Sequence, residues 1–148
     1  MADVLTPAQR TRAMSAVRSA NTTPELRLRR GLHARGLRFR LHRRDLPGSP
    51  DLVLPRFRAA VFVHGCFWHR HPGCPKAATP ATRTDYWGPK FARNVERDAA
   101  AIAALRALGW RVAVVWECAL GARQAARTAD ALADWLHGDA PTVAIPAG

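Results

Sequence analysis

A segment of twelve residues near the middle of the chain combines metal-type ligands, histidines and adjacent aromatic rings. It reads Val63-His64-Gly65-Cys66-Phe67-Trp68-His69-Arg70-His71-Pro72-Gly73-Cys74. Thiol and imidazole groups are costly to bury without partners, so a strand in a hydrophobic core does not explain this mixture. We therefore expect a loop that binds a metal ion and carries further groups for chemistry.

Four residues form a candidate zinc site of the Cys₃His type. Cys66, His71 and Cys74 are close enough in sequence to reach one tetrahedral ion, and Cys118 follows a predicted strand downstream. Spacing alone does not separate His71 from His69 as the fourth ligand. Four protein ligands leave no open position, so this zinc would be structural. Three unrelated buried cysteines are the alternative interpretation.

Asp51 is a candidate ligand for Mg²⁺. It follows Pro50 and begins an apolar strand, and hard carboxylate oxygens suit Mg²⁺ bound to phosphate. The acid and lysine that often follow on the next strand of a nuclease are missing, because that strand reads Ala60-Val61-Phe62-Val63-His64. The backbone carbonyl of Val63 could supply the second oxygen. An aspartate that only caps a turn is the alternative.

A histidine could replace the missing lysine as general base. Histidine is the usual side chain for taking a proton from water near neutral pH, so His69 is a candidate base. Asp98, within Asn94-Val95-Glu96-Arg97-Asp98, could orient a histidine by accepting its second N–H. A solvated helix face is the alternative for Asp98.

The charge of the chain indicates a polyanionic partner. The 148 residues carry a net charge of +12, and all but two of the 23 basic residues are arginine. Arginine binds phosphate through two hydrogen bonds and stacks on bases, which favours nucleic acid. A GC-rich genome would explain arginine in place of lysine, but not the excess of basic over acidic residues.

Several apolar residues are candidates for insertion into DNA. Phe67, Trp68 and Trp87 have polar and basic neighbours, which suits side chains that enter between base pairs, although tryptophan is more often buried in a core. Met14 and Val17 lie on a basic predicted helix and could press on the opposite groove, or else face the core.

The elements that must position these residues predict an α/β fold with a mixed central sheet flanked by helices. Capping signals begin helices at Thr6 and Thr22, and the second is expected to end at Gly36. A three-strand meander, a long helix and a strand parallel to the last meander strand follow. The predicted strands are 37–41, 52–54, 59–63 and 110–116, the later helices are 91–108 and 125–136, and 75–89 is expected to be irregular.

We expect a single domain over residues 1–137, in which residues 1–20 form a basic helical arm, and a flexible tail over 138–148. The chain lacks a run of about 18 apolar residues and a signal-peptide pattern, which predicts no membrane span and a cytoplasmic location. Three cysteines beside histidines favour a metal site over disulfides.

Five stretches of the chain resemble the very short patch repair endonucleases, bacterial enzymes that act on T:G mismatches. The resemblance extends from Met1 to about Trp135, and its middle and last stretches are highly specific. The stretches are Met1-Ala2-Asp3-Val4 with Arg12-Ala13-Met14; Leu46-Pro47-Gly48-Ser49-Pro50-Asp51; His64-Gly65-Cys66-Phe67-Trp68-His69; Ala81-Thr82-Arg83-Thr84; and Asn94-Val95-Glu96-Arg97-Asp98 with Gly109-Trp110-Arg111-Val112 and Val115-Trp116-Glu117-Cys118-Ala119-Leu120.

The resemblance implies a restriction-endonuclease-like fold, one structural zinc and a Mg²⁺-dependent nick 5′ of the mismatched thymine left by deaminated 5-methylcytosine. It implies a monomer that works beside a cytosine-5 DNA methyltransferase on double-stranded DNA. The implied roles are Asp51 and the Val63 carbonyl for Mg²⁺, His69 as base oriented by Asp98, Glu25 and His64 as assisting residues, His71 as the zinc ligand, Phe67, Trp68 and Trp87 as a wedge opposite Met14 and Val17, and Lys90 and Asn94 as DNA contacts.

Two other functions remain open. A non-catalytic zinc protein that recognises distorted DNA would need the basic surface and the aromatic side chains, but not Asp51. A restriction-type nuclease would cut matched duplex on both strands.

Overall fold

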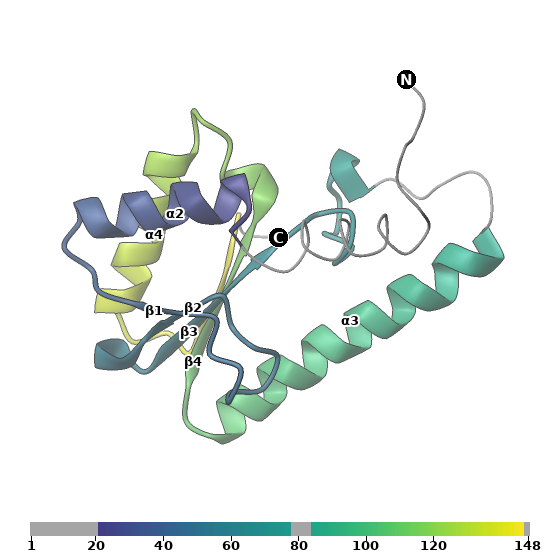
Figure 1. Cartoon of the computed structure of the whole chain (residues 1–148), viewed down its shortest axis with the longest axis horizontal. Coiled ribbons are helices and arrows are strands. Elements are labelled where there is room, and N and C mark those ends of the chain that lie inside the picture. Colours follow the sequence, from purple (N-terminus) through teal and green to yellow (C-terminus); the bar gives the residue numbers. More distant parts are fainter. Residues whose placement is uncertain (1–20, 78–83, 147–148) are drawn as a thin grey trace.

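A five-stranded mixed sheet forms the centre of the computed structural model, which describes residues 21–77 and 84–146 (Figure 1). The strands lie in the order β1-β2-β3-β4-β5. The strands are β1 (Arg40–Leu41), β2 (Leu52–Leu54), β3 (Ala59–His64), β4 (Arg111–Trp116) and β5 (Thr142–Ile145), and the α-helices of the described residues are α2 (Thr23–Ala34), α3 (Thr84–Ala107) and α4 (Ala125–His137).

The first three strands form an antiparallel meander, and the last three pair in parallel. Leu52 of β2 lies opposite Val61 of β3. Helix α3 connects β3 to β4, and the parallel register places His64 opposite Trp116. The predicted mixed sheet and the predicted parallel pair are therefore confirmed.

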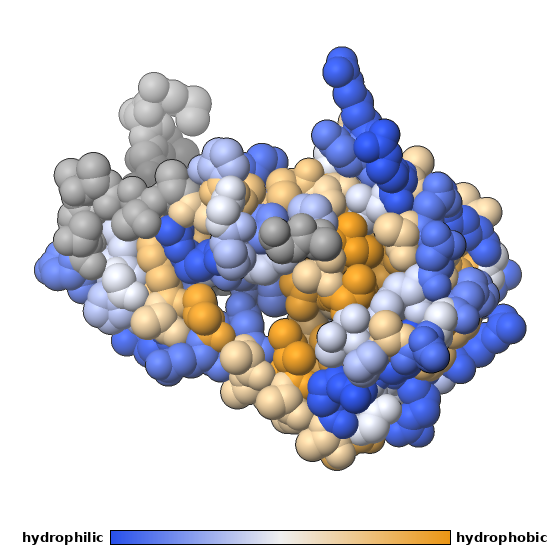
Figure 2. Space-filling model, turned by 180° about the vertical axis from the view of Figure 1, so that it is seen from behind, coloured by the Kyte–Doolittle hydropathy of each residue, from blue (hydrophilic) through white to orange (hydrophobic). Residues whose placement is uncertain are grey.

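Helices cover both faces of the sheet (Figure 1). Helices α2 and α4 pack on one face with Val61 and Val115, and α3 packs on the other with Phe62 and Val112. Because β3 and β4 are buried on both faces, their sequences are nearly continuous apolar runs. Seen from behind, the periphery of the molecule is largely hydrophilic and apolar side chains gather toward the centre (Figure 2).

Helix α2 begins as its sequence predicts. The hydroxyl of Thr22 accepts a hydrogen bond from the backbone N–H of Glu25 at 3.4 Å, and Pro24 lies in the first turn. Glu25 and Leu28 point into the molecule and are almost fully buried. The capping signal therefore predicts the helix start and also fixes the place of a buried carboxylate.

Helix α3 is longer than its sequence predicts. Residues 84–89, expected to be irregular, form its first turns, with Pro89 inside the helix. Proline removes one backbone hydrogen bond there, but aromatic contacts stabilise these turns. The ring of Trp87 lies 5.8 Å from that of Phe67 and 5.6 Å from that of Phe91. Tertiary packing therefore outweighs the local signal.

The two ends of the sheet also differ from the prediction. The strand expected over 37–41 pairs only at Arg40–Leu41. The tail expected to be flexible from residue 138 instead contains β5, which pairs with β4 and buries Ile145. Pairing satisfies the backbone groups along the outer edge of β4, which explains why this short segment is ordered.

The described residues contain no helix long and apolar enough to cross a membrane. The basic arm expected over residues 1–20, together with Met14 and Val17, lies outside the described residues.

Candidate active site and metal centre

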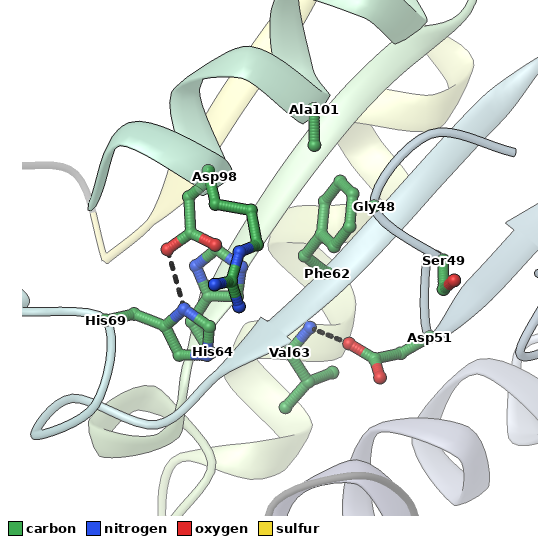
Figure 3. A pocket seen from close by; sticks show the side chains of 10 residues that line it. Gly48, Ser49, Asp51, Phe62, Val63, His64, His69, Asp98 and Ala101 are labelled. Carbon is green, nitrogen blue, oxygen red and sulfur yellow. Dashed lines mark hydrogen bonds and ion pairs between the residues drawn. The ribbon is translucent and has the colours of Figure 1, made fainter. Parts of the chain in front are cut away.

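A cleft at the carboxyl end of β3 brings together the residues that were predicted to act on phosphate, except Glu25 (Figure 3). Its walls come from the loop before β2, from β3 and the loop after it, and from the middle of α3. The lining residues are Gly48, Ser49, Asp51, Phe62, Val63, His64, His69, Arg97, Asp98 and Ala101.

Asp51 and Val63 meet where the ladder between β2 and β3 ends. Oδ2 of Asp51 accepts a hydrogen bond from the backbone N–H of Val63 at 2.7 Å. In a strand, the N–H and C=O groups of one residue point to the same side. The carbonyl of Val63 is therefore directed to the side on which the Asp51 carboxylate lies. Two hard oxygen donors at this point fit a cation such as Mg²⁺.

Burial raises the pKa of Asp51 to about 6. The N–H of Val63 and the charges of His69 and Arg29 act in the opposite direction, but desolvation is the larger effect. A partly desolvated carboxylate in a cleft is typical of functional sites, because a cation or a proton must compensate its charge.

His69 is held by a carboxylate of α3. Its Nδ1 atom lies 2.6 Å from Oδ2 of Asp98, and its backbone N–H donates to the carbonyl of Gly65 at 3.1 Å. A carboxylate at Nδ1 favours the tautomer with its proton on that nitrogen, which leaves Nε2 as the basic atom. The pair therefore has the geometry of a general base and its orienting acid.

His64 packs against His69 as an uncharged ring. The two ring centroids are 3.9 Å apart and the planes are 5° from parallel. Burial lowers the pKa of His64 to about 3, and the charge of His69 acts in the same direction. His64 is therefore a neutral hydrogen-bonding group at neutral pH.

Glu25 lies in a second polar group beside Asp51. Glu25 is 2 % exposed, and its Oε2 contacts both Arg29 Nη2 and His42 Nε2, the latter at 3.0 Å. Ligand-type atoms of Glu25, His42 and Asp51 lie within 4.8 Å of one another. The predicted assisting residue Glu25 is thus close to Asp51, and Arg29 compensates its charge.

Sequence reasoning missed the contributions of Arg29, His42 and Arg97 to this region. The backbone N–H of His42 donates to the carbonyl of Asp51 at 3.0 Å. A signal for His42 existed, because antiparallel pairing of residues 40–41 with 52–53 places position 42 opposite 51. Arg97 is adjacent to Asp98 in sequence and could have been found from that position on α3.

The four predicted zinc ligands converge at the neighbouring end of β3 and β4. Their ligand atoms lie within 4.8 Å of one another. His71 Nδ1 is 3.6 Å from Cys66 Sγ and 3.5 Å from Cys118 Sγ. Zinc bonds of about 2.3 Å to sulfur and 2.0–2.1 Å to nitrogen give a tetrahedral S···N edge of about 3.6 Å. The set of Cys66, His71, Cys74 and Cys118 therefore fits zinc, and His69 belongs to the cleft.

The predicted aromatic wedge residues Phe67, Trp68 and Trp87 form one half-buried cluster. The ring centroids of Phe67 and Trp68 are 5.0 Å apart, and those of Trp68 and Trp87 are 5.9 Å apart. The ammonium group of Lys90 lies 5.9 Å from the Trp68 ring, and Asn94 Nδ2 donates to the Trp68 carbonyl at 3.2 Å. Lys90 and Asn94 are therefore placed between the aromatic cluster and the cleft on α3.

A basic α/β protein in which an aspartate and a carboxylate-bound histidine share a cleft has the arrangement expected of a metal-assisted nuclease. The family model described as "DNA mismatch endonuclease Vsr" matches residues 2–75. The chain belongs to this family of DNA endonucleases.

Curated relatives agree with the family model over most of the chain. The DNA mismatch endonuclease Vsr of Escherichia coli is 43% identical over 148 residues, which cover 98% of this chain and 94% of the relative. The type II nicking enzyme V.XorIIP of Xanthomonas oryzae pv. oryzae is 56% identical over 120 residues, or 81% and 88% of the two chains. The type II nicking enzyme V.NmeAIP of Neisseria meningitidis is 39% identical over 120 residues, or 81% and 85%.

Proposed function

We propose that this mismatch endonuclease uses Mg²⁺ to nick one strand of duplex DNA 5′ of the thymine in a T:G pair. Such pairs arise when 5-methylcytosine loses its amino group. The observation that carries the proposal is that Asp51 and the His69–Asp98 pair line one cleft. The mismatch itself is supported by the names of the family and of the E. coli relative.

Asp51 and the carbonyl of Val63 would hold Mg²⁺ in this proposal. Their convergence at the end of the β2–β3 ladder supports the assignment. Bound magnesium would polarise the phosphate and compensate the charge that develops on its oxygens. Glu25 and His64 lie beside these ligands and would position water molecules near the scissile phosphate.

His69 would remove a proton from the attacking water through Nε2. The hydrogen bond between its Nδ1 and Asp98 stabilises the imidazolium that forms and fixes the ring. In-line attack by that water would break the bond between phosphorus and the 3′ oxygen, and the 3′ oxygen would take a proton from solvent water, leaving a 3′-hydroxyl and a 5′-phosphate. In this proposal the cleft would supply a base, its orienting acid and the ligands for the cation.

The aromatic wedge would recognise the mismatch by entering the duplex. Phe67, Trp68 and Trp87 would insert between base pairs from one groove, opposite Met14 and Val17 of the N-terminal arm. Insertion costs less where pairing is already weak, so a mismatch favours it. Lys90 and Asn94 would contact the DNA beside the wedge, and the net charge of +12 would attract the duplex.

The coarser architecture supports further proposals about the whole molecule. We infer a restriction-endonuclease-like fold that is stabilised by one structural zinc at the Cys₃His set. The domain would include the basic arm of residues 1–20 and extend beyond residue 137 to Ile145, because β5 completes the sheet. The protein would act as a cytoplasmic monomer beside a cytosine-5 DNA methyltransferase whose product creates the mismatch.

A nicking assay tests the proposal against its alternatives. Duplexes of one sequence carrying T:G or T:A are incubated with Mg²⁺ or with EDTA. We expect one nick, on the thymine strand of T:G, only with Mg²⁺. Asp51→Ala and His69→Ala should abolish nicking and retain mismatch binding. Binding without any nick would indicate a non-catalytic DNA-binding protein, and equal cutting of both duplexes would indicate a restriction-type nuclease.

A further inference from the structure

Arg97 is a cleft residue to which no role has been given above. It lies on α3 immediately before Asp98, and it lines the cleft together with Asp51, His64 and His69. Among the described residues that line the cleft, it is the one with a permanent positive charge. Its guanidinium is therefore the group in the cleft best suited to an anionic ligand.

The guanidinium of Arg97 makes no hydrogen bond or ion pair within the described part of the chain, and the helix explains why. Side chains three or four residues apart face each other on a helix, and these positions hold Arg93, Asn94, Ala100 and Ala101. The adjacent acid Asp98 is one residue away and is already bonded to His69. Arg97 is exposed, so its charge is available to a ligand.

The charges of the cleft favour such a group. A phosphodiester that approaches His69 also approaches the carboxylates of Asp51 and Asp98, which repel it. His69 is engaged with Asp98, and His64 is buried and stacked on His69. A guanidinium can bind two non-bridging phosphate oxygens at once, which both attracts the phosphate and orients it.

The position of Arg97 along α3 continues a polar row. Lys90, Asn94 and Arg97 are spaced by four and three residues, so they follow one face of the helix over about 10 Å. The row begins beside Trp68 of the aromatic wedge and ends at the cleft. A DNA strand held by the wedge would therefore pass along this row toward His69.

We propose that Arg97 binds the non-bridging oxygens of the scissile phosphate and holds it between Asp51 and His69. The inference rests on the proposed function, because it assumes a phosphodiester in this cleft. The inference gives the cleft a phosphate-binding residue, a role that its two aspartates and two histidines do not fill.

Removal of the charge on either partner tests the contact. T:G duplexes are prepared with a normal phosphate or with one uncharged methylphosphonate 5′ of the mismatched thymine. Their affinities for the wild-type protein, Arg97→Gln and Arg97→Lys are measured without divalent cations. The control is Arg127→Gln, the same charge change at an exposed position of α4 on the opposite face of the sheet.

We expect the methylphosphonate to weaken wild-type and Arg127→Gln binding by about tenfold or more, the effect of one lost charge-assisted hydrogen bond. Arg97→Gln should bind both duplexes with nearly equal affinity, and Arg97→Lys should fall between. Arg97→Gln should also reduce the slope of log affinity against log salt by about one, whereas Arg127→Gln should not. An equal effect of the methylphosphonate on wild type and Arg97→Gln would overturn the proposal.

Nicking separates this inference from the proposed function. With Mg²⁺, Arg97→Gln should slow single-turnover nicking at saturating protein by about tenfold to a hundredfold. This is the factor expected from the loss of one hydrogen bond to a charged group. A wild-type protein that binds but does not nick T:G duplexes would overturn the proposed function alone. The binding comparison would still report whether Arg97 contacts that phosphate. Normal nicking by Arg97→Gln would overturn the inference alone.

Discussion

The Nδ1 atom of His69 lies 2.6 Å from Oδ2 of Asp98, so α3 fixes the ring of a histidine that the loop after β3 supplies. The two residues are far apart in sequence, and their contact depends on the packing of α3 against the sheet. Because the bond occupies Nδ1, it determines which nitrogen of His69 can accept a proton. The tautomer of the proposed base is therefore set by a residue outside its own loop.

Asp98→Asn should slow nicking by about 10²- to 10⁴-fold, the range that a positioned base contributes. An asparagine NH₂ would donate to Nδ1, which moves the ring proton to Nε2. Nε2 would then have no lone pair with which to accept a proton from the attacking water. Single-turnover nicking of a T:G duplex measures the change, and mismatch affinity should stay within about threefold of wild type.

The matched control for Asp98 is Glu96→Gln, which removes a carboxylate from an exposed position of the same helix. It should nick at close to the wild-type rate. If both variants lost activity equally, the effect would come from the charge of α3 and not from the tautomer of His69.

Asp51→Asn should stabilise the protein at neutral pH when no divalent cation is present. The folded-state pKa of Asp51 is about 6, above its usual value of 3.8, so the folded protein binds this proton more tightly than the unfolded chain. The folded protein therefore loses stability relative to the unfolded chain as pH rises from about 4 to 6. A shift of this size corresponds to about 3 kcal/mol at pH 7–8.

Thermal unfolding of wild type and Asp51→Asn at pH 4.5, 6 and 7.5 measures this effect. The advantage of Asp51→Asn should increase with pH and then level off, while its nicking is lost. Asp45→Asn is the control, because Arg43 lowers the pKa of that exposed carboxyl. A variant difference that did not change between pH 4.5 and 7.5 would contradict the assignment to Asp51 burial.

The Cys₃His set should bind one zinc ion per chain. His71→Ala and Cys118→Ser each remove a ligand, so the purified variants should contain little zinc and unfold at lower temperature. His69→Ala is the control that separates the two candidate histidines, because it should retain zinc but lose nicking. Elemental analysis gives the metal content, and loss of zinc from His69→Ala together with retention in His71→Ala would reverse the two roles.

Much of the site could be predicted because the signals that position it are local. The apolar runs of β3 and β4 have a long helix between them, and this arrangement favours a parallel pair. Register then places Cys118, which follows β4, near Cys66, which follows β3. The same reasoning brings Asp51 to the β2–β3 edge, since Leu52 lies opposite Val61.

The remaining features depend on contacts between distant segments. The first turns of α3 contain Pro89 and form because Trp87 packs on Phe67. Strand β5 has only four residues, and it is ordered by pairing with the edge of β4. The proximity of His42 to Glu25 requires the pairing of β1 with β2, which two residues alone establish. Local propensity carries none of this information.

Trp68→Ala should reduce the preference for mismatched over matched DNA. Trp68 is part of the half-buried aromatic cluster proposed to act as the wedge, and stacking of one aromatic ring on a base contributes about 1–3 kcal/mol. Affinity for a T:G duplex should therefore fall by about fivefold to 150-fold, because every 1.4 kcal/mol is a factor of about ten. Affinity for the T:A duplex of the same sequence, which resists insertion, should change much less.

The matched control for Trp68 is Tyr86→Ala, which removes an aromatic ring that is 46% exposed and lies beside Trp87 on α3. Fluorescence anisotropy with both duplexes gives the ratio of affinities, and thermal unfolding checks that each variant is folded. Tyr86→Ala should keep the wild-type ratio, because its ring is not part of the wedge. If both variants reduced the ratio equally, discrimination would come from the general aromatic surface of α3 and not from insertion by Trp68.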